Sequence, residues 1–83
     1  MLNTDYNQEN IQDIIINLIA NKTELDSDEI EIDKTFASYD IDSVLALEIS
    51  GELEDLLELK INPIVLFEYP TIELLAKYLV ELK

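Results

Sequence analysis

Apolar residues recur at helical spacing near the start of the chain and predict a first helix that ends near residues 21–22. Polar residues lie opposite these positions, as is typical of a helix with one buried face. The apolar positions are Ile11, Ile14, Ile15, Leu18 and Ile19. Asp5 together with Gln8, or Asn7, is suited to cap this helix. Residues 1–6 are then expected to form a flexible lead-in.

A second apolar stripe predicts a helix from about Ser43 to Leu59. Its expected buried face consists of Ala46, Ile49, Ser50, Leu53, Leu56 and Leu57. Gly51 lies in the middle of this helix at a cost of roughly 1 kcal/mol relative to alanine. Close approach of another backbone, from this chain or from a partner, would explain a glycine there.

The last third of the chain predicts two further helices. Asn62-Pro63 is suited to open a short third helix and Tyr69-Pro70 to end it, because Asn can cap and Pro fits the first helical position. Its expected apolar side consists of Ile64, Leu66 and Phe67. Thr71 can cap a fourth helix, whose expected inward residues are Ile72, Leu75, Ala76, Leu79 and Leu82.

Between the first two helices, residues 23–42 show a looser pattern that predicts a long loop. Ile30, Ile32 and Phe36 are spaced to anchor this loop in the core, and a short helical turn is expected near Ser27 to Ile30. The predicted fold is therefore all-α: a small four-helix bundle with three longer helices, a short third helix and a long loop between helices one and two. Residues 1–83 are expected to form a single domain.

Composition removes several classes of chemistry. The chain of 83 residues contains neither cysteine nor histidine, so it has no thiolate or imidazole for nucleophilic, general-base or metal-ligating roles. The acidic run at residues 26–28 does not form a calcium loop, because Glu31 stands where that loop needs glycine and Ala37 where it needs glutamate. Paired carboxylates show no arrangement beyond that of a solvated acidic surface, and we therefore expect no enzyme activity.

Charge and hydropathy limit the classes of partner that this chain is expected to bind. Nineteen acidic residues against five basic ones give a net charge of −14, which repels nucleic acid and favours partners with basic surfaces. A solvated surface that keeps a small protein soluble also explains this charge, and both interpretations can hold together. No apolar run is long enough to span a membrane and no leader is evident, so we expect a soluble, cytoplasmic protein without membrane contact.

The stretch Tyr39 to Glu48 contains the candidate site. Asp42-Ser43 precedes a strongly helical run, and a serine there has an open hydroxyl above unpaired backbone N–H groups, which favour a phosphate. An ordinary helix cap is the simpler interpretation of the same pair. Not all of the following apolar residues fit the buried stripe. Val44, Leu45 and Leu47, rimmed by Asp42 and Glu48, predict a small apolar patch with an acidic border, although each could instead cover the end of the loop.

From about Phe36 to Leu82 the chain resembles acyl carrier proteins, most of all the carrier domains of polyketide synthases. The resemblance rests on the runs DSVLALEI at residues 42–49 and LFEYPTIELLAKYL at residues 66–79. It implies that a separate transferase attaches phosphopantetheine from coenzyme A to Ser43, and that the arm's thiol holds acyl intermediates as thioesters.

The same resemblance implies roles for other residues and for partners. Asp42 would help the transferase to recognise the modified serine. Val44, Leu45, Leu47 and Glu48 match the family's recognition helix, and Ile64 matches a position that often borders the arm. The implied partners are the phosphopantetheinyl transferase, a ketosynthase, an acyltransferase and other synthase domains, and the isolated domain is expected to be a monomer.

The sequence departs from this family at one position. These carriers usually have the order Gly-x-Asp-Ser, in which the glycine stands three residues before the modified serine. Here Asp40 occupies the glycine position. Asp tolerates a positive φ better than most residues, so we expect the turn to be retained. The missing glycine pair favours an acyl carrier over a peptidyl carrier domain of a nonribosomal peptide synthetase. That peptidyl carrier and an acidic helical interaction module, with Ser43 only as a cap, are the alternatives.

Overall fold

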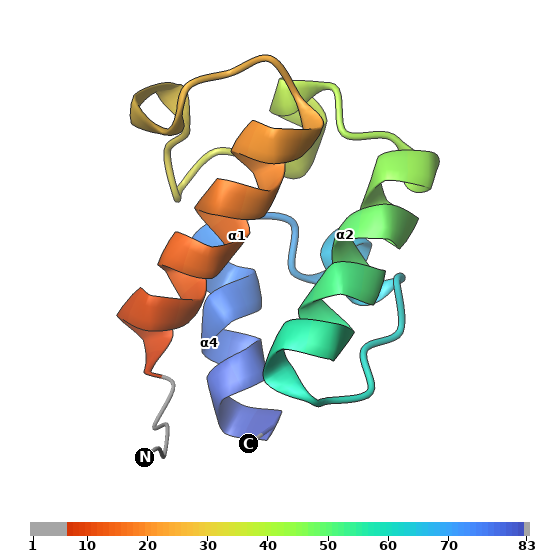
Figure 1. The fold of residues 1–83 in the computed structure, drawn as a ribbon. Helices are drawn as coiled ribbons and strands as arrows, with labels where there is room; N and C mark the ends of the chain where they lie inside the picture. Colours follow the sequence, from red (N-terminus) through yellow and green to blue (C-terminus); the bar gives the residue numbers. More distant parts are fainter. Residues whose placement is uncertain (1–6, 83) are drawn as a thin grey trace.

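Three longer helices pack together in the computed structural model, which describes residues 7–82 (Figure 1). Their bounds, with those of the short helices between them, are α1 Gln8–Lys22, the 3₁₀ turns η1 Ser27–Glu29 and η2 Phe36–Tyr39, α2 Ser43–Leu57, α3 Val65–Glu68 and α4 Ile72–Leu82. Within the described residues, β pairing is limited to an isolated antiparallel bridge between Thr35 and Thr71. The predicted all-α four-helix architecture is confirmed.

Helix α1 begins and ends with side-chain caps. The Asn7 side chain accepts a hydrogen bond from the Asn10 backbone N–H at 2.8 Å. The Thr23 hydroxyl donates to the Ile19 carbonyl at 2.8 Å at the other end. Of the two predicted caps, Asn7 is confirmed, whereas Asp5 lies outside the described residues, as does the predicted lead-in.

The core lies between α1, α2 and α4, and α1 packs most extensively against α4. Its largest fully buried apolar side chains are Ile11, Ile15, Ile19, Ile49, Leu53, Leu57, Leu66, Ile72, Leu75 and Leu79. Ser50 is also buried, and its hydroxyl donates to the Leu47 carbonyl at 2.9 Å, which satisfies it within the helix. Most of the predicted core positions are therefore confirmed.

Some expected core residues are exposed instead. Leu56 is 51% exposed because it lies roughly 80° around α2 from the centre of the buried stripe. Leu82 is 44% exposed at the end of α4, where fewer neighbours can cover it. In and beside α3, Val65 and Leu66 are buried, while Ile64 and Phe67 are exposed, so the three predicted apolar residues of this helix, Ile64, Leu66 and Phe67, do not share one environment.

The ends of α2 and α3 also differ from the prediction. Helix α2 ends at Leu57, two residues early, because Glu58 adopts a left-handed conformation with φ 55°. The Asn62 side chain caps the turn before α3 by accepting from the Ile64 N–H at 3.0 Å, but the α-helix itself begins only at Val65. Tyr69 ends α3, and the Thr71 hydroxyl caps α4 by accepting from the Leu74 N–H at 3.1 Å, as predicted.

The long connection between α1 and α2 crosses one end of the bundle (Figure 1). Ile30 and Phe36 are buried and Ile32 is half-buried, which confirms the predicted anchors. Backbone bonds tie the loop to the start of α4: the Phe36 N–H donates to the Pro70 carbonyl at 2.8 Å, and the Glu73 N–H donates to the Ile32 carbonyl at 3.0 Å. The predicted turn near Ser27 is present as η1, whereas η2 had no counterpart in the prediction.

Gly51 has no close neighbour within the described part of the chain. A β-carbon built at this position meets no heavy atom within 4 Å outside its own helix backbone. The expected close approach of another backbone is therefore wrong for this chain. Across residues 7–82, no helix combines the length and the hydropathy needed to cross a membrane.

Candidate functional site

A left-handed residue closes the turn that leads into α2. Asp40 has φ 61° and ψ 30°, and its N–H donates to the Ala37 carbonyl at 3.0 Å. The next residue, Ile41, is buried and so fixes the chain at this point. The prediction that aspartate would take over the conformation of the usual glycine is confirmed.

Asp42, and not Ser43, is the N-cap of α2. One Asp42 carboxylate oxygen accepts from the Leu45 N–H at 2.9 Å, and the Asp42 carbonyl accepts from the Ala46 N–H at 2.8 Å. Ser43 is the first helical residue and is exposed. Among the described residues its hydroxyl has no hydrogen-bond partner. The capping function is thus fulfilled by Asp42, which leaves the Ser43 hydroxyl available for other chemistry.

The start of α2 can also accommodate an anion on that hydroxyl. The N–H groups of Ser43 and Val44 have no acceptor within the part of the chain that the structure describes, as expected for the first turn of a helix. They lie at the positive end of the helix dipole of a 15-residue helix. An exposed hydroxyl next to free N–H groups fits a phosphate ester, so the residues present fit a phosphopantetheine attached here.

The predicted recognition residues lie in different surroundings. Val44 and Leu47 are 62% and 59% exposed, and they lie three residues apart on one face of α2. Ile64 is 53% exposed just before α3. Leu45 is half-buried and faces a groove instead of the exposed patch, so the expected trio is reduced to a pair.

Glu48 is already paired within the chain. The Lys22 ammonium at the end of α1 lies 3.3 Å from a Glu48 carboxylate oxygen, and it also pairs with Glu52 one turn further along α2. Hydrogen bonds first to Glu52 and then to Glu48 raise the pKa of Lys22 above its ordinary value of 10.5. Glu48 therefore links α1 to α2 as well as lying on the predicted recognition face.

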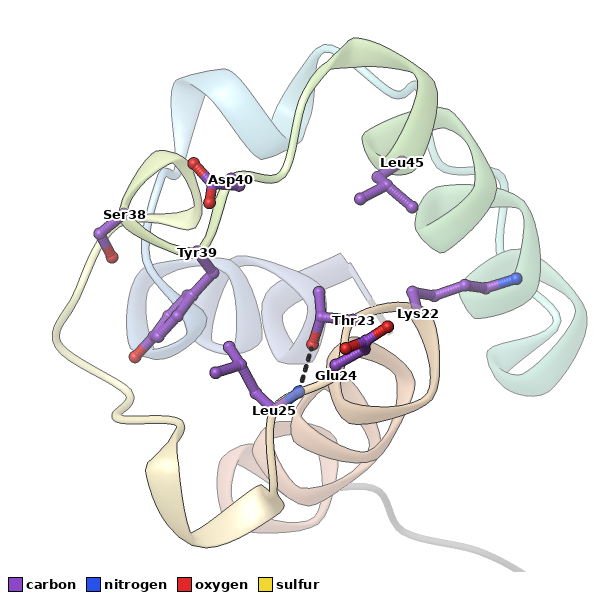
Figure 2. Close-up of a pocket in the computed structure, with 8 residues that line it drawn as sticks. All are labelled: Lys22, Thr23, Glu24, Leu25, Ser38, Tyr39, Asp40 and Leu45. Carbon is purple, nitrogen blue, oxygen red and sulfur yellow. Dashed lines mark hydrogen bonds between the residues drawn. The ribbon is translucent and has the colours of Figure 1, made fainter.

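Two hollows flank the start of α2. One is an open groove of about 450 Å³ between the end of α1, η2 and the start of α2, which we call the α1–η2 groove (Figure 2). It is lined by Lys22, Thr23, Glu24, Leu25, Ser38, Tyr39, Asp40 and Leu45. The other is a smaller cavity of about 220 Å³ that includes Phe36, Ala46, Leu66 and Phe67 in its walls.

Sequence reasoning missed several residues near the site. Phe67 is 57% exposed at the smaller cavity, and its spacing of three residues from Ile64 was a signal that both lie on one face. Leu25 and Tyr39 form part of the α1–η2 groove. Tyr39 is the first residue of the predicted candidate stretch 39–48, but no sequence signal could have found Leu25, because the loop that brings the two together has no periodic pattern.

Comparison with known proteins identifies the family. The family model described as "phosphopantetheine attachment site" matches residues 13–79. The polyketide synthase PksL of Bacillus subtilis (strain 168) is 32% identical over 68 residues, which cover 82% of this chain and 2% of the synthase. The chain thus spans only a small part of this curated relative.

Solved structures show the same fold. A free-standing peptidyl carrier protein from an Acinetobacter baumannii secondary metabolic pathway is 42% identical, with a TM-score of 0.88 over 93% of this chain and 98% of that chain. An acyl carrier protein from Anabaena sp. PCC 7120, with a variant phosphopantetheinylation-site sequence, is 38% identical, with a TM-score of 0.85 over 99% of this chain and 93% of that chain. With most of its length matched by the family model, this chain belongs to the phosphopantetheine-attachment family of carrier proteins, whose prosthetic group is covalently attached phosphopantetheine.

Proposed function

We propose that this protein is an acyl carrier protein in which Ser43 holds the phosphopantetheine arm and the arm's thiol holds acyl or polyketide intermediates as thioesters. The observation that supports Ser43 most directly is its exposed hydroxyl at the first position of α2, free of the capping role that Asp42 performs. The chain is then a tethered carrier of substrates and not a catalyst.

Attachment requires a second protein. The Ser43 oxygen forms a bond to the phosphorus that bears the pantetheine chain in coenzyme A, the bond from that phosphorus to the adenosine bisphosphate half breaks, and the serine proton is lost to a base. The chain has no histidine, and the carboxylate next to Ser43 already accepts from the Leu45 N–H. We therefore assign the base to the phosphopantetheinyl transferase.

The proposed docking surface surrounds Ser43. Val44 and Leu47 supply exposed apolar area on α2, and Ile64 supplies more before α3. Asp42 and Glu48 add negative charge at the rim, which favours the basic surfaces of a transferase, a ketosynthase or an acyltransferase. Weak, fast and salt-dependent encounters suit a carrier that must visit several partners in turn.

The experiment is to incubate the protein with coenzyme A and a broad-specificity phosphopantetheinyl transferase and to measure its intact mass. We expect the mass of one phosphopantetheine to be added to the wild type and to Ser27→Ala, an exposed serine in η1 that serves as the matched control. Ser43→Ala should remain unmodified. A wild type that gains no mass, or a Ser43→Ala variant that does, would contradict the proposal.

A peptidyl carrier is the second candidate, and one observation favours it: the similarity to the free-standing peptidyl carrier protein of Acinetobacter baumannii at 42% identity. The similarity to PksL and the absence of the glycine pair before Ser43 favour the acyl type. The two types differ in how the thiol is loaded. We expect the phosphopantetheinylated protein to accept an acyl group from an acyltransferase, whereas loading only by an amino-acid-adenylating domain would establish the peptidyl type.

A further inference from the structure

We propose that the α1–η2 groove holds the pantetheine part of the arm while no partner enzyme is bound. This inference rests on the proposed attachment at Ser43. It concerns the protein's own covalently tethered arm, and it assigns the resting position of that arm to the groove formed by α1, η2 and α2.

The groove lies within reach of the attachment point. Asp40 and Leu45, which both line it, are three and two residues away from Ser43 along the chain. Three residues span at most about 11 Å even when fully extended. A pantetheine chain is comparable in length to five extended residues, or roughly 17 Å. It can therefore reach past Asp40 and Leu45 and continue into the groove.

The walls of the groove are held in place before any arm is present. The Tyr39 hydroxyl accepts from the Glu31 N–H at 2.7 Å and donates to the Glu31 carbonyl at 3.1 Å, which fixes the ring. The Thr23 hydroxyl accepts from the Leu25 N–H at 3.3 Å and so fixes the chain where it leaves α1. Figure 2 shows the Tyr39 ring and Leu25 on one side of the groove and Leu45, from α2, on the opposite side. A wall that is already ordered reduces the entropy lost when a flexible arm binds.

The chemistry of the walls suits an amide chain. Leu25, Leu45 and the Tyr39 ring offer apolar contact for the methyl and methylene groups of pantetheine. The carboxylates of Glu24 and Asp40 are exposed, and within residues 7–82 neither has a hydrogen-bonded or ionic partner. Both can accept from the two amide N–H groups and the hydroxyl of the arm.

The charges keep the phosphate outside. Lys22 is the only basic residue among those that line the groove, and its ammonium is already paired with Glu48 and Glu52. The phosphate therefore stays at the positive end of α2, while the neutral remainder of the arm enters a groove that carries unpaired negative charge.

The test compares the amide and side-chain NMR signals of the protein before and after phosphopantetheine is attached, with the intact mass measured on the same samples. We expect shifts at residues 23–25 and 38–40 in addition to those next to Ser43, and nuclear Overhauser effects from arm protons to Leu25 and Tyr39. Residues 23–25 are far from Ser43 in the sequence, so their response reports contact with the arm.

A matched pair of variants separates contact from general perturbation. Leu25→Asn should abolish the shifts at residues 38–40, whereas Leu56→Asn, an exposed leucine outside the groove, should leave them unchanged. If Leu25→Asn fails to fold by circular dichroism, Leu25→Ala replaces it and should weaken the same shifts. NMR shifts confined to residues 42–46, or centred on Phe36, Leu66 and Phe67, in protein of the correct added mass would contradict the proposed resting position in the groove. They would leave the proposed attachment at Ser43 unaffected. Protein that gains no mass would contradict the proposed function itself.

Discussion

Asp40 adopts a backbone conformation that few side chains tolerate. With φ 61° and ψ 30° it lies in the left-handed region, where most L-residues pay about 1–2 kcal/mol. Aspartate and glycine tolerate this conformation, whereas a β-branched residue does not. We expect Asp40→Val to lower the free energy of unfolding by about 1–2 kcal/mol relative to Asp40→Gly, as measured by urea denaturation.

The matched control for this comparison is Asp33→Val against Asp33→Gly. Asp33 is exposed in the same loop and does not have a positive φ. The free energy of unfolding of Asp33→Val should be at least as high as that of Asp33→Gly, since glycine there only adds entropy to the unfolded chain. Equal stabilities of the two variants at position 40 would show that the turn before Ser43 does not need a left-handed residue.

Gly51 offers a second test at the level of one residue. It is exposed in α2, and an added β-carbon has no neighbour within 4 Å. Gly51→Ala should therefore raise the free energy of unfolding by roughly 0.8–1.0 kcal/mol, the difference in helix propensity. The check is the same urea titration, and an unchanged or lowered stability would contradict the open environment. Slower modification by the transferase in this more stable variant would indicate that a partner's backbone comes close at this position.

Between elements, Lys22 ties the end of α1 to α2. Its ammonium pairs with Glu48 and Glu52, which raise its pKa in the folded protein above 10.5. Because the folded pKa is the higher one, this contribution to stability is complete below the unfolded pKa and is lost as the pH rises through the folded value. Lys22→Met should therefore melt below the wild type at neutral pH, and this difference should shrink as the pH rises above 10.5.

Lys34→Met is the matched control because it removes the same charge. Lys34 lies in the exposed loop, 3.4 Å from a Glu31 carboxylate oxygen that is three residues away, and it joins no two helices. Its effect on the melting temperature should be smaller at neutral pH, since exposed pairs contribute little. A Lys22→Met deficit that stays constant from neutral to strongly alkaline pH would refute the proposed role of the charge.

An element could be predicted from the sequence when its signal is local in the sequence, and could not when it depends on backbone geometry or on distant packing. The helices and their caps at Asn7, Asp42 and Thr71 were predictable because caps and apolar spacing are local features. The end of α2 was not predictable, since it is set only by the backbone conformation of Glu58. At the site, the position of Ser43 on a helix start followed from the pattern, but the separation of Leu45 from Val44 and Leu47 depends on the packing of the distant loop against α2.

For the molecule as a whole, the dominant electrostatic feature is its excess of acidic groups. A net charge of −14 is distributed over a body of only 34 × 25 × 19 Å. At about 0.01 M salt the screening length is roughly 30 Å, comparable to the whole molecule, so nearly all acidic groups repel one another. At 0.15 M it falls to about 8 Å, and only near neighbours still interact. Since unfolding moves the charges apart, repulsion weakens the fold most at low salt.

We therefore expect the melting temperature to rise as sodium chloride is increased from about 0.01 to 0.15 M, the range over which screening shortens below the size of the molecule. The control is the triple variant Asp13→Asn, Asp28→Asn and Asp55→Asn, which removes three exposed negative charges from different elements. Its melting temperature at low salt should exceed that of the wild type, and its rise with salt should be smaller. A wild-type melting temperature that is flat or falls over this range would mean that local pairs such as Lys22 with Glu48 outweigh the overall repulsion, because screening weakens attractive pairs as well.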